Sequence, residues 1–175
     1  MKKENFLLLI LILVSCSEIE PRKPLNQKGD SFMINSAQRN KNLFKKEEQL
    51  LKEAAFKDST HKFEISKSGF LYAYTKTNTQ IKNLPTTGEI VRFQYQIEDL
   101  NKNVIYSFKE LGPVEYAIDQ EDLLPALREG LRLLQPEDVA VFLFPSYLCY
   151  SYQGDGQKIG INQPLRFIIE RLPNN

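Results

Sequence analysis

Residues 89–100 alternate between apolar and polar side chains, strictly so at 91–98, and this pattern constrains the fold more than any other part of the chain. Polar residues separate the apolar positions, which are Val91, Phe93, Tyr95 and Ile97. Successive side chains of a strand point to opposite faces of a sheet, so the pattern predicts an antiparallel strand with one buried face. The polar residues 101–103 predict a turn, and residues 104–108 predict a returning strand that completes a hairpin.

A short helix and further strands complete the predicted domain. Pro125 fits the first turn of a helix, where its missing N–H costs nothing, and Pro136 ends that helix. The apolar face of the helix consists of Leu124, Leu127, Leu131 and Leu134. Residues 139–144 are apolar on both faces, which predicts a central strand, and residues 165–169 alternate as a closing strand. Shorter strands are expected at 70–75 and 115–119. A curved antiparallel sheet packed on one short helix is an α+β architecture.

The first residues are typical of a secretory signal. Lys2 and Lys3 precede an unbroken apolar run at 6–14, which is too short for a comfortable transmembrane helix. The sequence 13–16, Leu-Val-Ser-Cys, resembles a bacterial lipobox. It predicts that residues 1–15 are a lipoprotein signal peptide and that Cys16 receives the lipid that anchors the chain to a membrane. The alternative is an ordinary signal peptide in which Cys16 has no role.

A polar segment and a helix precede the domain. Residues 16–35 contain Pro21, Pro24 and Gly29 and predict a flexible tether. Residues 36–62 are rich in helix formers, and their apolar side chains follow helical spacing, so an N-terminal helix is expected there. Within it, residues 45–48 have the composition of a solvated face. The helix either packs on the following domain, at 69–173, or serves as a dimerisation or partner arm.

Charge and motifs exclude several function classes. The net charge is +1 with balanced signs, so attraction to nucleic acid is not expected. Residues 144–172 contain no plausible acid–base pair, metal cluster or phosphate loop, and no cofactor is expected. They contain four aromatic residues before a glycine-containing turn, which predicts a site that works by apolar shape. Asp155, in that turn, is interpreted as a turn residue.

Cys149 has two interpretations. As a nucleophile it would need a base, but the only histidine, His61, lies far away in the sequence in a polar segment. The alternative is a small buried apolar residue, which the surrounding apolar run favours. With Cys16 lipidated, no disulfide can form within one chain.

The order of predicted elements resembles that of the FKBP-type peptidyl-prolyl isomerases over residues 69–172. The segments that carry the resemblance are Arg128-Glu129-Gly130-Leu131, Phe144-Pro145-Ser146, Leu148-Cys149-Tyr150 and residues 159–165. Together with the lipobox and the leading helix, residues 103–107 and 150–159 resemble the GldI-type gliding-motility lipoproteins of Bacteroidetes. The resemblance implies an FKBP-like fold.

The resemblance also implies a site. Tyr150 matches a tyrosine whose hydroxyl bonds a substrate carbonyl, Tyr95 matches a pocket tyrosine, and Phe167 matches a phenylalanine at the pocket base; these are the expected catalytic residues. The substrate-binding positions it implies are Ile105, Tyr106, Val114, Leu123, Leu124, Leu127 and Ile159. Tyr106 stands where the family has an aspartate, and Leu127 stands where most members have a tryptophan.

Two functions follow as expectations. The first is a peptidyl-prolyl cis-trans isomerase that acts on proline-containing protein clients and assists motility or secretion proteins in the cell envelope. The residue after Cys16 is not aspartate, which favours the outer membrane, facing the periplasm. The second is an FKBP-like binding or scaffold module of a motility or secretion complex, motivated by the substitutions at Leu127 and Tyr106.

Overall fold

The computed structural model describes residues 28–78 and 83–173. The chain divides into two units, residues 1–38 and 39–175. Of the first unit the structure describes residues 28–38, which are the first part of helix α2 (Lys28–Lys57). The remainder of α2 and the other described elements belong to the second unit. The predicted signal peptide, Cys16 and tether residues 16–27 lie outside the described residues.

Both ends of helix α2 lie earlier in the chain than those of the helix predicted at 36–62. It begins at Lys28, within the segment predicted as a tether, and ends at Lys57 rather than at residue 62. Glycine costs about 1 kcal/mol in a helix interior, so Gly29, in the first turn, does not prevent the helix from starting. At the other end, the Asp58 carboxylate accepts a hydrogen bond from the Thr60 hydroxyl at 2.6 Å, which stabilises a turn instead of a further helical residue. Within residues 28–78 and 83–173, no helix combines the length and apolarity needed to cross a membrane.

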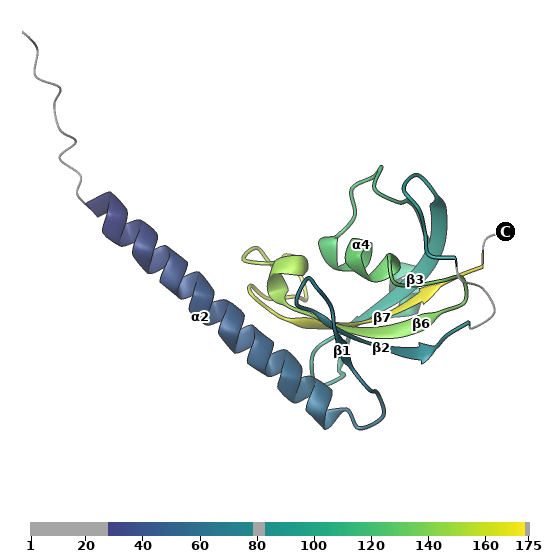
Figure 1. The fold of residues 1–175 in the computed structure, drawn as a ribbon, viewed down its shortest axis with the longest axis horizontal. Coiled ribbons are helices and arrows are strands. Elements are labelled where there is room, and N and C mark those ends of the chain that lie inside the picture. Colours follow the sequence, from purple (N-terminus) through teal and green to yellow (C-terminus); the bar gives the residue numbers. More distant parts are fainter. Residues whose placement is uncertain (1–27, 79–82, 174–175) are drawn as a thin grey trace, which may run out of the picture. The chain divides into compact units, whose positions relative to one another are not determined.

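Seven antiparallel strands form one sheet (Figure 1). They are β1 (Glu64–Ile65), β2 (Leu71–Lys76), β3 (Ile90–Glu98), β4 (Val104–Tyr106), β5 (Val114–Ala117), β6 (Val139–Phe144) and β7 (Leu165–Arg171). Their order is β1-β2-β6-β7-β3-β4, and β5 also pairs with β3. β6 is therefore central, as its two apolar faces predicted. In β3, Val91, Phe93 and Ile97 are completely buried, which confirms the predicted alternation.

Helix α4 (Pro125–Leu131) lies across one face of the sheet (Figure 1). It begins at Pro125, as predicted, and Leu127 and Leu131 are buried. Gly130 permits close packing, since a Cβ atom there would lie 2.9 Å from the Ile169 side chain. The helix ends before the turn that contains Pro136, because the next N–H groups bond carbonyls three residues back in tighter turns. The predicted α+β class, with a curved antiparallel sheet and few helices, is confirmed.

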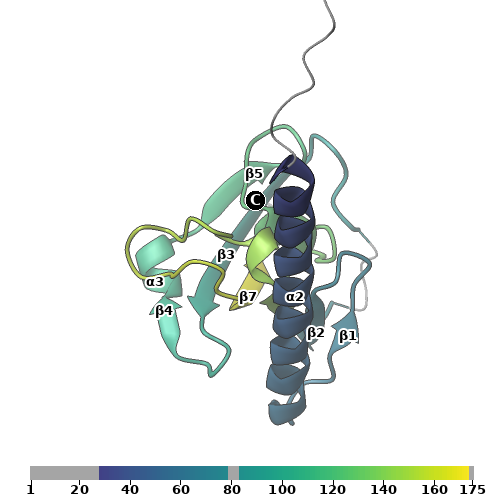
Figure 2. The ribbon, with the colours of Figure 1, turned by 90° about the vertical axis from the view of Figure 1, so that its left-hand side faces the viewer.

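A second short helix, α3 (Phe108–Leu111), replaces the end of the predicted returning strand. Ser107 and Glu110 form a capping box, in which each side chain bonds the backbone N–H of the other residue. This S-x-x-E signal was present in the sequence. Figure 2 shows α3 and β4 beside the loop that precedes β7. The two-residue strand β1 was also not predicted.

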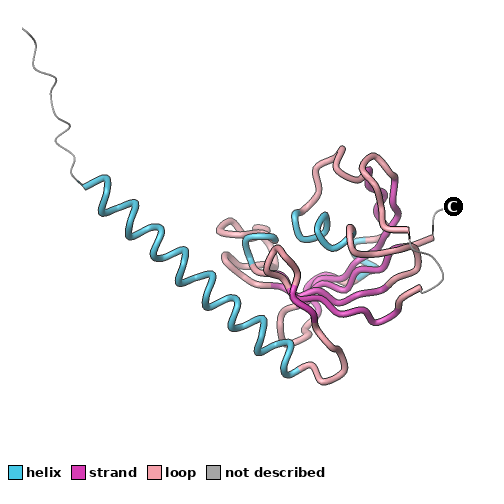
Figure 3. The backbone as a smooth tube through the Cα atoms, viewed as in Figure 1, coloured by secondary structure: helices cyan, strands magenta, loops and turns pink. Residues whose placement is uncertain are grey.

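The chain between β6 and β7 is mostly irregular (Figure 3). It contains one short 3₁₀ helix, η1 (Ser146–Leu148), and then a long loop. The Ser151 N–H donates to the Ser146 carbonyl at 2.9 Å, and the Asn162 N–H donates to the Ser151 carbonyl at 2.6 Å. These bonds close the base of the loop, in which Ser151 has a φ of +51°.

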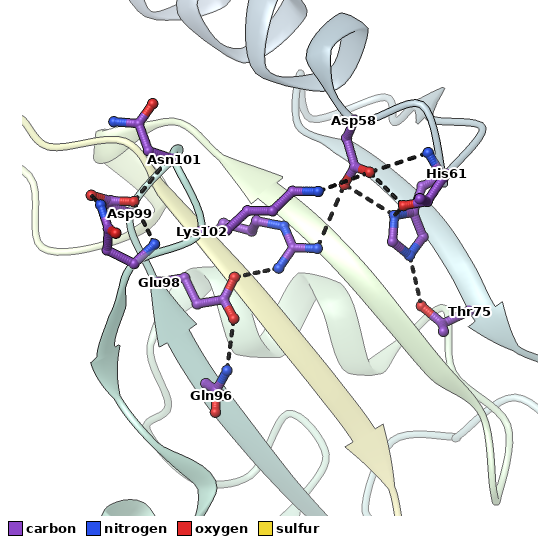
Figure 4. A network of polar contacts seen from close by, with 11 residues as sticks. Asp58, His61, Thr75, Gln96, Glu98, Asp99, Asn101 and Lys102 are labelled. Carbon is purple, nitrogen blue, oxygen red and sulfur yellow. Dashed lines mark hydrogen bonds and ion pairs between the residues drawn. The ribbon is translucent and has the colours of Figure 1, made fainter.

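A buried polar network joins the residue after α2 to the sheet (Figure 4). Arg166 of β7 bonds Glu98 of β3 and lies 3.6 Å from the Asp58 carboxylate. Asp58 also pairs with Lys102 and with Nδ1 of His61, each at 3.0 Å. The network links the end of α2 to β3 and β7, and loss of one partner would leave the buried charges of Asp58, Glu98 or Arg166 uncompensated.

Candidate functional site

The ten side chains that the sequence predicts for the site gather on one apolar cluster. Three of them are buried within it: Leu127, Ile159 and Phe167. Seven are partly buried against it: Tyr95, Ile105, Tyr106, Val114, Leu123, Leu124 and Tyr150. They come from β3, β4, β5, α4, β7 and four loop positions, so only the folded chain brings them together.

Stacked aromatic rings lie at the centre of this cluster. The ring of Tyr95 stacks on that of Phe167 with centroids 6.2 Å apart and an interplanar angle of 11°. It also stacks on Phe93, at 5.8 Å. The β3–β7 register places Tyr95 opposite Ile169 and Phe167 opposite Ile97, which makes the two rings diagonal neighbours. Diagonal cross-strand neighbours lie within reach of aromatic side chains. Phe167 is completely buried, whereas Tyr95 keeps part of its side chain exposed.

Two tyrosine hydroxyls at the site form no hydrogen bond with the described part of the chain. The tyrosines whose hydroxyls form hydrogen bonds within the protein are Tyr72, Tyr74, Tyr106, Tyr116 and Tyr147. Tyr152, on the long loop, is 72% exposed and faces solvent. By contrast, no residue of 28–78 or 83–173 forms a hydrogen bond with the hydroxyl of Tyr95 or Tyr150, although both side chains are partly buried. Partly buried hydroxyls usually find partners, so these two are available to a ligand.

Both free hydroxyls are protonated at neutral pH. Burial raises the pKa of Tyr95 above its usual value of about 10. Burial, and then the neighbouring Tyr95, Cys149, Asp155 and Tyr106, raise the pKa of Tyr150 to about 12. The site therefore presents two neutral O–H donors on an otherwise apolar surface.

Asp155 takes part in the site in a way that the sequence did not predict. It is a turn residue, as interpreted, because its Oδ1 accepts the N–H groups of Gln157 and Ile159, each at 2.8 Å. Its Oδ2 also accepts the hydroxyl of Tyr106 at 2.5 Å. The two residues are 49 positions apart, so no local pattern could have signalled the pair.

Cys149 is a buried apolar residue, which confirms the second interpretation of this position. It is 7% exposed, and burial, followed by the charge of Glu47, raises the pKa of its thiol. His61 pairs instead with Asp58 and Thr75, so it is not the base of a Cys–His pair. Among the described residues, no group of three or more His, Cys, Asp or Glu side chains is arranged to hold a metal ion.

An apolar cavity of about 330 Å³ lies apart from these residues. It is lined by Phe44, Glu48, Leu51, Lys52, Ile65, Gly69, Leu71 and Tyr147. None of the ten predicted site residues contributes to it. Its volume alone therefore does not identify it as the site, and the free hydroxyls of Tyr95 and Tyr150 are the better indicator.

Comparisons with known proteins agree with the resemblance seen in the sequence. The sequence model of the family described as FKBP-type peptidyl-prolyl cis-trans isomerase matches residues 82–172, a range that includes all ten site residues. A curated relative is named as a probable FKBP-type peptidyl-prolyl cis-trans isomerase, FkpA, of Neisseria meningitidis serogroup B (strain ATCC BAA-335 / MC58). It is 36% identical over 126 residues, which are 71% of this chain and 44% of the relative. The chain thus spans less than half the length of that relative.

Two solved structures share the fold. FkpA from Escherichia coli superposes with a TM-score of 0.59 at 16% identity, over 99% of this chain and 82% of that one. A peptidyl-prolyl cis-trans isomerase from Pseudomonas syringae pv. tomato DC3000 also has a TM-score of 0.59, at 17% identity, over 76% of this chain and 93% of that one. At these identities the structures show the fold alone, and the predicted FKBP-like fold class is confirmed.

Proposed function

We propose that this chain, which belongs to the family of FKBP-type peptidyl-prolyl cis-trans isomerases, catalyses rotation of the peptide bond before proline in protein clients. One observation carries the proposal. The hydroxyls of Tyr95 and Tyr150 have no hydrogen-bond partner among the described residues, and both tyrosines pack against the apolar cluster on which the ten predicted site residues gather. Such a surface can bind a proline ring while offering a donor to a nearby carbonyl.

The reaction needs neither a nucleophile nor a general base. Resonance in the peptide bond creates a rotational barrier of about 18–20 kcal/mol. The same resonance places partial negative charge on the carbonyl oxygen, which water stabilises in the planar form. This charge separation falls when the bond twists, so an apolar surface that excludes water favours the twisted form relative to the planar one. Tyr95, Leu127 and Phe167 provide that surface.

Tyr150 acts by positioning the client. A hydrogen bond from its hydroxyl to the carbonyl of the rotating bond would stabilise the planar form and slow rotation. A bond to a different client carbonyl holds the chain in place while the bond before proline turns. The high pKa of Tyr150 keeps its hydroxyl a donor throughout the neutral range.

The direct test is acceleration of Ala-Pro isomerisation in a short peptide by the full chain, purified in detergent. We expect catalysis by wild type and a clear loss in the double variant Tyr95→Phe, Tyr150→Phe, which removes both free hydroxyls and keeps both rings. A wild-type rate equal to the uncatalysed rate would refute the isomerase function. It would favour the alternative, a scaffold that binds proline-containing segments without catalysing their isomerisation. Binding of the same peptide by wild type would then test the scaffold.

We also propose that the chain is a lipoprotein, attached through Cys16 to the outer membrane and facing the periplasm. The support is the lipobox-like sequence at 13–16 and the absence of aspartate after Cys16. The likeness to GldI-type lipoproteins supports clients among gliding-motility or secretion proteins. Replacement Cys16→Ala should release the protein from the membrane fraction and remove the mass of the acyl chains. Unchanged mass and fractionation would refute the anchor.

Helix α2 is proposed as a dimerisation arm. Within the second unit, Phe44, Leu50 and Phe56 of this helix remain 48%, 36% and 91% exposed. The proposal rests mainly on Phe56, whose ring is almost fully exposed and offers an apolar contact to a second chain. Sedimentation of wild type should show a dimer that Phe56→Glu weakens, and a wild-type monomer at all concentrations would exclude this role.

A further inference from the structure

The carboxylate of Asp155 bonds two separate parts of the site at once. Oδ2 accepts the hydroxyl of Tyr106, in β4, at 2.5 Å. Oδ1 accepts the backbone N–H of Ile159, on the loop before β7, at 2.8 Å. A single side chain thereby connects a partly buried residue of one wall of the site with a buried residue at its rim.

Lys158 makes a second connection between the same two segments. Its ammonium donates to the Ile105 carbonyl at 3.1 Å and to the Glu110 carboxylate at 2.8 Å. It also lies 4.5 Å from the centroid of the Tyr106 ring, in cation–π geometry. The loop before β7 therefore contacts β4 and α3 through two residues that are three positions apart, Asp155 and Lys158 (Figure 2).

β4 needs such a connection because the sheet holds it weakly. It is a three-residue edge strand that pairs only with β3, at Tyr106 with Ile97 and at Val104 with Glu98, and the register shifts between these two pairs. Two irregular pairs leave the position of Ile105 and Tyr106 poorly defined by backbone hydrogen bonds. Contacts from outside the sheet then decide where this wall lies.

We propose that Asp155 is a positioning residue of the site, which sets the distance between Ile105 and Tyr106 of β4 and Ile159 of the loop before β7. It also binds the Tyr106 hydroxyl, so that this hydroxyl does not bond the client. This inference rests on the proposed isomerase function. It explains why Tyr106 presents its ring to the site while Tyr95 and Tyr150 keep their hydroxyls free. Asp155 itself touches no reacting atom.

The protonation states agree with this geometry. The hydrogen bond to Asp155 is the main cause that raises the pKa of Tyr106. Burial alone would raise the pKa of Asp155, but the bonds from Tyr106 and from backbone N–H groups outweigh it and lower the pKa to about 2. The contact is therefore between a carboxylate and a neutral phenol under ordinary conditions.

The test compares four variants of the full chain: Asp155→Ala, Asp155→Asn, Tyr106→Phe and the double variant Tyr106→Phe, Asp155→Ala. We expect Asp155→Ala to raise KM about tenfold while kcat falls less than about twofold, since the carboxylate that accepts from Tyr106, Gln157 and Ile159 is lost and the reacting surface remains. Asp155→Asn keeps an oxygen for the N–H groups and an N–H donor for the Tyr106 oxygen, so it should restore KM to within about threefold of wild type.

The double variant decides whether the two residues act as a pair. If they do, its KM should match that of Asp155→Ala alone. Asp99→Ala is the matched control, because Asp99 also accepts two backbone N–H groups in a turn, those of Asn101 and Asn103, but contacts no tyrosine. Effects of Tyr106→Phe and Asp155→Ala that simply add, or an effect of Asp155→Ala no larger than that of Asp99→Ala, would overturn the proposal.

Amide hydrogen exchange separates this proposal from the function on which it rests. The N–H groups of Ile105 and Tyr106 should exchange at least about tenfold faster in Asp155→Ala, and by a clearly smaller factor in Asp99→Ala, whose lost bonds lie in the turn before β4. An inactive wild type would refute the proposed function. The exchange rates would then still test whether Asp155 holds β4 in place. Equal β4 exchange in wild type and Asp155→Ala would overturn this role of Asp155, with or without catalysis.

Discussion

The carboxylate of Glu47, in helix α2, accepts hydrogen bonds from both donors of Ser146. The Ser146 N–H bonds Oε2 at 2.8 Å, and its hydroxyl bonds Oε1 at 2.6 Å. Both residues are 2% exposed, so the sequence-based interpretation of residues 45–48 as a solvated face is wrong for Glu47. Ser146 begins η1, and its carbonyl accepts the N–H groups of Cys149 and Ser151 on either side of Tyr150. Helix α2 is thus bonded directly to the segment that positions Tyr150.

Replacement Glu47→Ala should destabilise the protein by about 1–3 kcal/mol, because two buried donors of Ser146 lose their acceptor. Urea unfolding measures this loss. Glu48→Ala is the control, since Glu48 is exposed and, among the described residues, its ion pair is with Lys52, also exposed, so this variant should unfold close to wild type. Equal stability of the two variants would show that the Glu47–Ser146 contact contributes nothing.

Replacement Tyr150→Phe should lower kcat/KM for Ala-Pro isomerisation by about 3- to 10-fold, the value of one hydrogen bond to the client. The measurement is peptide isomerisation with the full chain. Tyr152→Phe removes a hydroxyl from the same loop, but that side chain is 72% exposed, so wild-type kinetics are expected. A loss of the same size in both variants would argue against a specific role for the Tyr150 hydroxyl.

Gly154→Ala should disturb the site more than Gly156→Ala. Both glycines have positive φ, +66° and +74°, so either substitution costs about 1–2 kcal/mol of backbone strain. A Cβ atom at Gly154 would also lie 2.5 Å from the Ile159 carbonyl oxygen, whereas nothing lies within 4 Å of one at Gly156. The clash adds about 1–3 kcal/mol and moves Ile159, so KM should rise in Gly154→Ala alone. Thermal unfolding and kinetics of the pair test this, and indistinguishable variants would contradict it.

Asp58→Asn should weaken the dependence of stability on acid pH. Burial would raise the pKa of Asp58, but hydrogen bonds from Thr60, His61 and Lys102 outweigh it and lower the pKa below the unfolded value of about 3.9. A group with a lowered folded pKa stabilises the fold fully above the unfolded value, and this stabilisation is lost as pH falls toward the folded pKa.

Urea unfolding at about pH 5 and about pH 2.5 tests the Asp58 prediction. The difference in unfolding free energy between the two pH values should be smaller for Asp58→Asn than for wild type. The exposed Asp122→Asn should keep the wild-type difference. If Asp58→Asn also keeps it, Asp58 does not contribute to acid sensitivity.

Cys149 should resist alkylation in the folded protein. Burial, and then the charge of Glu47, raise the pKa of its thiol, and the reactive thiolate is correspondingly scarce. In a Cys16→Ala background, iodoacetamide at pH 8 should leave the native chain unlabelled and add one group in urea. Rapid labelling without urea would contradict the burial of this side chain.

Local elements could be predicted because near neighbours determine them. The alternation around Phe93 predicted β3 without reference to the rest of the chain. Pro125 marked the start of α4 because its ring suits the first turn of a helix. Boundaries were less predictable. Helix α2 ends where Asp58 joins a buried network with Arg166 and Lys102, and no pattern near residue 58 indicates those partners.

By itself, the sequence predicted most of the strands, helix α4 and the FKBP-type family, and it suggested ten positions for the site. Only the tertiary structure decided which polar groups those positions meet. Tyr106 meets Asp155 across 49 residues, and Glu47 meets Ser146 across 99, whereas the hydroxyls of Tyr95 and Tyr150 meet no partner among the described residues. The physical reason is that periodicity and turn preference act over a few residues. A buried polar group must instead find its partner among whatever side chains the completed sheet brings within hydrogen-bond distance.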